Sequence, residues 1–290
     1  MRKRHRGRGS RRGGSGFYII VTLLSLGAVW YYVTFHAQPY RSEGLSLHFI
    51  DVGQGDATLV QTRGGNVLID GGPAGAGDAV VRHLRGAGVR SIAYVIATHP
   101  HADHIGGLID VLGEFEIGTI IMPRVAHTTL TFERFIAAIE ENDIPVREPV
   151  AGSTLNMGGA ALRIVGPNSS GYANLNNYSV SMVITYGEVS FLLTGDAEAE
   201  AELEMLERGH DLSAQVLRVG HHGSRTSTTQ PFLDAVSPLI AVISVGEGNQ
   251  FGHPHREVMG RLESAEVAVH RTDQRSTIVI STDGRILTIR

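Results

Sequence analysis

Residues 92–104 constrain the fold and the chemistry of this chain more than any other segment. Ile92–Ala97 is an uninterrupted apolar run, which predicts a short strand that is covered on both faces. Four side chains of metal-binding type follow within a few positions, in the order His99-Pro100-His101-Ala102-Asp103-His104. Imidazole and carboxylate groups together suit zinc, manganese or iron. The spacing lets the first two histidines converge on one cation, while the Asp-His pair begins the next helix and can face a second cation.

Short strands alternate with amphipathic helices along most of the chain. The first half predicts strands at Leu45–Ile50, Ala57–Gln61, Val67–Ile69 and Ile92–Ala97, a hairpin turn at Gly64-Gly65, and helices at Asp78–Gly86, Asp103–Leu112 and Thr129–Glu141. After Ile144 the pattern restarts, with strands at Leu162–Val165, Val180–Tyr186, Val189–Leu193, Val216–Val219, Ile240–Ser244, Val267–Val269 and Ile278–Ile280. Helices are expected at Glu198–Arg208, Gln230–Ala235 and Arg256–Glu263. Two such halves predict two packed sheets with helices outside.

The first 44 residues carry a different signal. Residues 1–16 hold seven Lys and Arg residues and no acid, and residues 17–35 contain no charge. An apolar stretch of this length can cross a bilayer, and a basic flank on its N-terminal side predicts that this flank stays inside. We expect a basic cytoplasmic tail at 1–16, a transmembrane signal anchor at 17–35, a linker at 36–44, and a single-pass protein whose domain at 45–290 lies outside the cytoplasm. Secretion after signal cleavage is the alternative.

Composition excludes several kinds of chemistry. The chain has no cysteine, which rules out disulfide partners, thiolate metal ligands and a cysteine nucleophile. Outside the basic tail, 18 basic residues stand against 29 acidic ones. This acidic body weighs against strong non-specific binding of nucleic acid by the protein alone, although bound divalent cations would partly offset the repulsion.

Several motifs, taken in order, resemble those of a known family. The pattern His-x-His-x-Asp-His after a strand is the signature of the metallo-β-lactamase superfamily. A narrower resemblance is to the hydrolase domain of ComEC-type competence proteins, and it rests on FIDVGQGDA at 49–57, LIDGG at 68–72, LTGD at 193–196, VGHHGS at 219–224 and GHP at 252–254. This resemblance covers roughly residues 45–290. It implies an α+β fold, a four-layer αββα sandwich, with two divalent ions, Zn or Mn, at its edge. With a single candidate span, the chain is expected to be a stand-alone, membrane-anchored relative.

The resemblance also implies roles for individual residues. The first metal would be bound by His99 and His101, the second by Asp103 and His104, and Asp196 would bridge the two. His221 or His222 would supply the last imidazole, and the other would face the substrate or be a buried, hydrogen-bonded histidine. Carboxylates that would orient the ligands are Asp70, Asp56 and Asp51. Further candidates for catalysis or substrate contact, besides Asp103, are His253, Ser224 and Asn177.

One stretch departs from the pattern of the superfamily. Most members place another metal-binding histidine shortly before the bridging aspartate, whereas the corresponding stretch here, at 176–180, reads Asn-Asn-Tyr-Ser-Val. ComEC-type domains share this Asn/Ser pattern, so the departure supports the narrower resemblance. It also predicts a looser first metal site, or one that prefers manganese.

The resemblance implies a phosphodiesterase or nuclease that uses water activated between two metals, with single-stranded DNA among its candidate substrates. The acidic body and the expected outside location favour an alternative, an extracellular phosphoesterase that acts on cell-wall or other small phosphate esters. An alternative of another class is a membrane-tethered binding module without turnover, against which the full ligand set counts. The missing histidine disfavours β-lactam hydrolysis.

Overall fold

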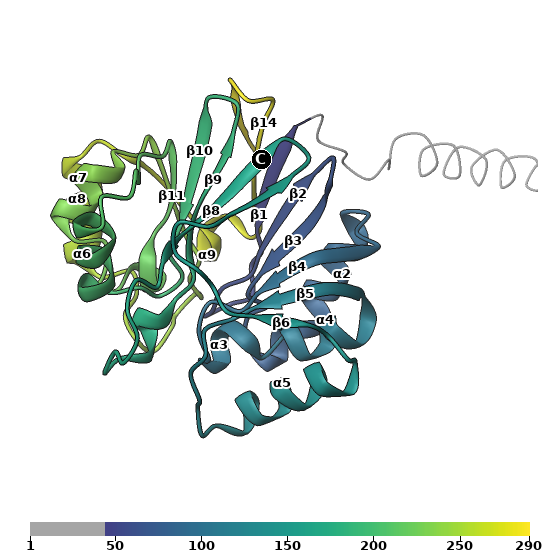
Figure 1. Cartoon of the computed structure of the whole chain (residues 1–290). Coiled ribbons are helices and arrows are strands. Elements are labelled where there is room, and N and C mark those ends of the chain that lie inside the picture. Colours follow the sequence, from purple (N-terminus) through teal and green to yellow (C-terminus); the bar gives the residue numbers. More distant parts are fainter. Residues whose placement is uncertain (1–43) are drawn as a thin grey trace, which may run out of the picture. The chain divides into compact units, whose positions relative to one another are not determined.

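The computed structural model describes residues 44–290, which form two β-sheets packed face to face (Figure 1). The first sheet contains, in spatial order, β15 (Leu287–Ile289), β14 (Ile278–Thr282), β1 (Leu45–Phe49), β2 (Thr58–Thr62), β3 (Gly65–Ile69), β4 (Ser91–Ile96), β5 (Glu116–Ile121) and β6 (Val146–Arg147). The second contains β13 (Ala268–Arg271), β12 (Ile240–Ile243), β11 (Val216–Arg218), β10 (Val189–Leu193), β9 (Ser181–Tyr186), β8 (Ala160–Gly166) and β7 (Thr154–Met157).

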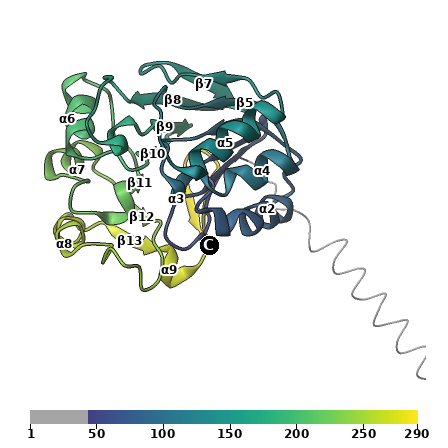
Figure 2. The ribbon, with the colours of Figure 1, turned by 90° about the horizontal axis from the view of Figure 1, so that it is seen from below.

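Helices cover the outer face of each sheet, as Figure 2 shows from below. The first sheet carries α2 (Gly77–Gly86), α3 (Ala102–Ile105), α4 (Leu108–Glu114) and α5 (Leu130–Glu141). The second carries α6 (Ala199–Glu207), α7 (Gln230–Val236) and α8 (Arg256–Ser264), and a short helix α9 (Thr272–Arg275) follows β13. The predicted α+β architecture of two sheets between helical layers is therefore confirmed.

Three apolar layers hold this arrangement together. The inner faces of both sheets meet in a central core that includes Phe49, Ile96 and Phe191. A second core lies between the first sheet and its helices, and a third lies between the second sheet and α6, α7 and α8. On α5, Phe135 is fully buried in the second core, whereas Phe132 is only partly buried. Burial of both faces explains why most strands read as short apolar runs without alternation.

The predicted helix at Asp103–Leu112 is interrupted. Residues 106 and 107 separate α3 from α4, and both are glycines. A Cβ atom on Gly107 would lie 2.1 Å from the carbonyl oxygen of Gly71. The backbone after β3 therefore packs directly against this break, which a residue with a side chain would prevent.

Strands from the two ends of the described region pair with each other. The prediction assigned Ile278–Ile280 to the second half of the chain, but β14 lies antiparallel to β1 in the first sheet, with Leu45 opposite Thr282. This correction follows from a pairing between residues that are far apart in sequence, for which periodicity carries no signal.

The predicted basic tail at 1–16 and transmembrane helix at 17–35 lie outside the described residues. Within residues 44–290, no helix combines the length and the apolar character needed to cross a membrane. The anchor and its orientation thus stay predictions from the sequence.

Candidate metal centre

Four strands end at one edge of the sandwich, and the loops after them carry the predicted metal-binding residues. In the first sheet, β3 and β4 run parallel and lead to Asp70 and to the segment 98–104. In the second sheet, β10 and β11 run parallel and lead to Asp196 and to the pair at 221–222. Carboxyl ends of parallel strands meet at the same edge of a sheet, so each sheet delivers its share of the site to one place.

Asp103, His104, Asp196 and His222 form a cluster in which one ligand atom from each residue lies within 4.8 Å of the others. The Nε2 atom of His104 is 3.2 Å from Oδ2 of Asp196. The Nε2 atom of His222 is 3.3 Å from Oδ2 of Asp103 and 3.6 Å from Oδ2 of Asp196. The structure therefore brings together the residues expected around the second metal, and it is His222 that completes this cluster.

The hydrogen bonds made by the Nδ1 atoms of His104 and His222 indicate whether their Nε2 atoms are available to a cation. Nδ1 of His104 donates to Oδ2 of Asp70 at 2.7 Å, and Nδ1 of His222 donates to the carbonyl oxygen of Ser244 at 2.9 Å. With one proton on Nδ1, Nε2 is the nitrogen of each ring that is left to bind a cation beside the carboxylates. Within the described part of the chain neither Nε2 atom has a hydrogen-bond partner. Lone pairs that converge on carboxylate oxygens fit a divalent ion between them.

Two buried carboxylates give this cluster a strongly negative potential. Burial acts to lower the pKa of His104, but Asp196, Asp70 and Asp103 together raise this pKa well above its ordinary value. Burial would raise the pKa of Asp196, yet His104 and His222 hold it well below its usual range. The cluster therefore favours positive charge inside a buried site, as a metal centre requires.

Asp70 orients two of the histidines. Its carboxylate is fully buried and accepts hydrogen bonds from the backbone nitrogen of Thr98 at 2.8 Å and from the Thr98 hydroxyl at 2.7 Å. Because that hydroxyl donates to Asp70, its oxygen accepts from Nδ1 of His99 at 3.1 Å. Asp70 thus lies where the sequence analysis expected an orienting carboxylate.

His99 and His101 are arranged less favourably for a cation. Nε2 of His99 lies 2.9 Å from Nδ1 of His101 and 3.9 Å from Oδ2 of Asp196. Burial is the main cause that lowers the pKa of both histidines. The two rings currently hydrogen-bond to each other, so an ion at this position requires His101 to turn.

The pair His221-His222 has an unusual backbone. Their φ angles are 47° and 53°, in the left-handed region that favours glycine, and each such residue costs on the order of 1–3 kcal/mol. The two rings consequently leave the chain in different directions. The side chain of His222 is 2% exposed, whereas that of His221 is 23% exposed and places Nδ1 at 3.1 Å from Oε1 of Glu198.

Arg218 was not expected at the site and lies directly behind it. The residue is 1% exposed, and its Nη2 atom is 2.8 Å from Oδ2 of Asp56. Its Nη1 atom donates to the carbonyl oxygen of Gly195 and lies 3.7 Å from Oδ1 of Asp196. The one available signal was a cationic residue inside the apolar run Val216–Val219, where a charge is retained only if it is paired.

The remaining candidates make contacts of other kinds. Asp51 accepts a hydrogen bond from the backbone of Gly53, and the Asn177 side chain is shared between the backbone of Glu198 and the carboxylate of Glu200. The Ser224 hydroxyl lies 3.0 Å from that of Thr226. The ring of His253 lies 5.6 Å from that of His221, and burial together with His221 and His222 lowers the pKa of His253 to about 4. His253 thus borders the centre, whereas Asp51 and Asn177 stabilise the surrounding loops.

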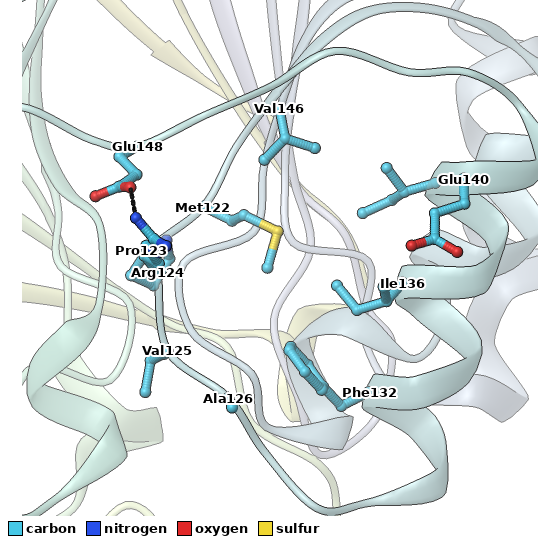
Figure 3. A pocket seen from close by; sticks show the side chains of 11 residues that line it. Met122, Pro123, Arg124, Val125, Ala126, Phe132, Ile136, Glu140, Val146 and Glu148 are labelled. Carbon is cyan, nitrogen blue, oxygen red and sulfur yellow. Dashed lines mark ion pairs between the residues drawn. The ribbon is translucent and has the colours of Figure 1, made fainter.

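An apolar hollow of about 640 Å³ lies beside the first metal-binding loop (Figure 3). Phe132 and Ile136 of α5 face Met122 and Val146 across it, and Arg124 pairs with Glu148 at its rim. Met122, Pro123, Val125 and Phe132 also pack around His99 and Pro100. The hollow therefore shares a wall with the loop that carries His99 and His101.

Comparisons with known proteins agree with this geometry. Residues 50–247 match the model of the metallo-beta-lactamase superfamily. The chain is 31% identical to ComE operon protein 3 of Bacillus subtilis over 84% of its own length and 34% of that protein. It is 32% identical to recombination protein 2 of Haemophilus influenzae and 30% identical to competence protein ComA of Neisseria gonorrhoeae, with 77% of this chain covered in each case. It spans about a third or less of the length of these relatives.

Solved structures show the same fold at low sequence identity. YhfI of Bacillus subtilis, a metallo-beta-lactamase fold protein, aligns with 81% of this chain and 98% of its own, with a TM-score of 0.52 and 14% identity. CmlA, a diiron beta-hydroxylase of Streptomyces venezuelae, aligns with 80% of this chain and 53% of its own, with a TM-score of 0.52 and 16% identity. The chain therefore belongs to the metallo-β-lactamase superfamily and is related to bacterial competence proteins.

Proposed function

We propose that this protein hydrolyses phosphodiesters with the help of two divalent ions, Zn or Mn, held at the edge of the sandwich. The observation that carries the proposal is the convergence of the buried His104, His222 and Asp196 with the partly exposed Asp103, in which the Nε2 atoms of both histidines lack a hydrogen-bond partner within residues 44–290. The relationship to competence proteins supports a phosphodiester over other esters, with single-stranded DNA as a candidate substrate.

The ligand roles follow from the contacts. Oδ2 of Asp196 lies 3.2 to 3.9 Å from nitrogens of His104, His222 and His99, so Asp196 is the carboxylate best placed to be shared between two ions. Asp103 and His104 would complete one position together with His222, and His99 and His101 would begin the other. When bound, such ions supply Lewis acidity toward phosphoryl oxygens and make water a stronger acid.

Residues at the rim would position the substrate. His253 borders the centre with a pKa of about 4, so its ring is neutral near pH 7. A neutral imidazole suits a hydrogen bond to a phosphoryl oxygen better than the delivery of a proton to the leaving group. Ser224, which follows His222 closely in the chain, is a second candidate for substrate contact, and its buried hydroxyl lies 3.0 Å from that of Thr226.

The test is turnover of bis-p-nitrophenyl phosphate and of a single-stranded oligonucleotide by the full chain loaded with Mn²⁺ or Zn²⁺. Wild-type protein should cleave both, and a variant with Asp103→Ala and His104→Ala should cleave neither. Equal turnover by the variant would reject the proposal. A wild-type protein that retains no metal and stays inert after either ion is added would instead favour a binding module.

The apolar hollow favours a second candidate, a phosphoesterase that acts on small esters outside the cell. Its wall joins the His99 loop, so a substrate with an apolar group could occupy it while its phosphate reaches the centre. The acidic body also disfavours a polyanion more than a small ester. Rates on oligonucleotides and on phosphocholine-type esters, compared at equal metal loading, separate the two candidates.

A further inference from the structure

The His99–His101 position lacks a third imidazole from the usual place in the sequence. The structure shows what occupies that stretch instead. Asn176 is buried, and its side-chain amide donates to Oε1 of Glu198 at 2.9 Å. Oε1 of Glu198 also lies 3.1 Å from Nδ1 of His221. The Asn/Ser stretch therefore contacts the centre through Glu198 and His221.

Glu198 determines which nitrogen of His221 is free. An ionised carboxylate can only accept a hydrogen bond, so Nδ1 of His221 carries the proton and Nε2 carries the lone pair. That Nε2 atom lies 3.7 Å from Oδ2 of Asp196. This is the same arrangement as in His104 and His222, where a hydrogen bond on Nδ1 leaves Nε2 to face the shared carboxylate.

The left-handed backbone at 221–222 separates the two rings. His222 points toward Asp103 and Ser244, whereas His221 points toward Glu198 and Asn176. His99 and His221 place their Nε2 atoms at 3.9 Å and 3.7 Å from the same atom, Oδ2 of Asp196. The two histidines of this motif thus approach the shared carboxylate from different directions.

We propose that His221 replaces the missing imidazole and binds the same ion as His99 and His101, while His222 binds the ion of Asp103 and His104. Glu198, held by Asn176, is the positioning residue that keeps Nε2 of His221 available. This assignment rests on the proposed two-metal centre. In this assignment the Asn/Ser stretch at 176–179 has a structural role. Its Asn176 holds the carboxylate of Glu198, and Glu198 in turn orients the ligand His221.

The experiment measures metal binding by the full chain, without any substrate. Protein stripped with a chelator is titrated with Mn²⁺ by calorimetry, and retained metal is counted by elemental analysis after dialysis. The central variant is His221→Gly, because glycine removes the ring and accepts the left-handed backbone. His221→Asn is a second variant, since asparagine also tolerates this conformation. His253→Ala is the matched control, because its ring borders the same centre.

Wild-type protein and His253→Ala should bind two ions. His221→Gly and His221→Asn should keep one tightly bound ion and lose the other or bind it at least tenfold more weakly. Glu198→Ala should weaken the same ion by about 10- to 100-fold, the range expected when the partner of a ligand histidine is removed. Thermal unfolding of each variant confirms that it is folded.

Two unchanged binding events in a folded His221→Gly variant would overturn the assignment, and so would a wild-type protein that binds a single ion. A wild-type protein that binds two ions, loses one in His221→Gly, and cleaves no phosphodiester supports the assignment while rejecting the proposed function. The two proposals therefore fail in different ways.

Discussion

The two sides of the candidate centre differ in how completely they are built. On the Asp103–His104 side, hydrogen bonds donated to Asp70 and to the carbonyl oxygen of Ser244 fix both imidazoles, and the ligand atoms already lie within 4.8 Å of one another. On the His99–His101 side, the two rings hydrogen-bond to each other at 2.9 Å. The first side is organised before an ion arrives, whereas the second must rearrange. We therefore expect one tight ion and one weaker ion.

The largest effect should come from the carboxylate that both sides share. Asp196→Asn replaces an anionic oxygen that faces His104, His99 and His222 with a neutral amide. We expect kcat/KM on bis-p-nitrophenyl phosphate to fall by about 10³-fold or more, or roughly 4 kcal/mol, and both ions to be lost. Loss of only the weaker ion would mean that Asp196 belongs to one side of the centre.

Arg218 lies behind the Asp103–His104 side of the centre, which we call the tight side. Its replacement should mainly lower the free energy of unfolding. Arg218→Met keeps much of the side-chain volume but leaves Asp56 buried without its partner. Breaking a buried ion pair in this way costs about 3–5 kcal/mol, measured as the free energy of unfolding in urea.

The matched control for that prediction is the double variant with Asp56→Asn. It removes the orphaned charge and should recover part of the lost stability. If Arg218→Met unfolds at the wild-type urea concentration, the ion pair does not contribute as the structure indicates.

Asp70 gives a way to weaken the tight side selectively. In Asp70→Asn, the new amide nitrogen can take the place of the oxygen that faces Nδ1 of His104, so the ring loses the acceptor that keeps its proton on Nδ1. We expect the tight ion to be bound about 10- to 100-fold more weakly in calorimetric titrations. An equal loss at both ions would show that the contact from Thr98 to His99 transmits the change to the weaker side.

The histidine pair His48 and His83, which is not part of the candidate centre, predicts how the free energy of unfolding depends on pH. Nδ1 of His48 in β1 lies 2.9 Å from Nε2 of His83 in α2, and burial together with His83 lowers the pKa of His48 to about 4. The folded protein keeps this ring neutral, while the unfolded chain takes up a proton below about pH 6.5. Stability from His48 is thus complete above pH 6.5 and is lost as pH falls toward 4.

The slope from this single proton is at most about 1.4 kcal/mol per pH unit. His48→Gln should make the fall in unfolding free energy between pH 6.5 and 4 shallower than in the wild type. The difference between the two proteins should be the same with and without added Mn²⁺, because the side chain of His48 contacts Ser46 and His83, which are not metal ligands. A difference that depends on metal would link this pair to the site.

The sequence predicts the strands and the position of the metal-binding residues because the signals for both lie within short segments. Apolar runs such as Ile92–Ala97 predict buried strands, and the group His99–His104 places metal-binding residues at a strand end. The pairing of β1 with β14 and the break at Gly107 depend on contacts between distant segments, which periodicity does not report.

Some features of the site could not be predicted from the sequence, because they too depend on the three-dimensional structure. The choice between His221 and His222 depends on a left-handed backbone that the residue types do not reveal. Arg218 and Glu198 act through partners at 56 and 221, which lie in other elements. Ligand residues can be recognised from their spacing, but the residues that hold them can be found only in three dimensions.

The antiparallel pairing of β1 with β14 also has a consequence for how the protein folds as it is made. The first sheet can be completed only after residues 278–289 have been synthesised, because β14 and β15 form its edge beside β1. Contacts between residues so distant in sequence slow folding, because a long loop must close before they can form. Until then β1 has an exposed edge that other strands can pair with, so a chain truncated before residue 278 should aggregate during expression.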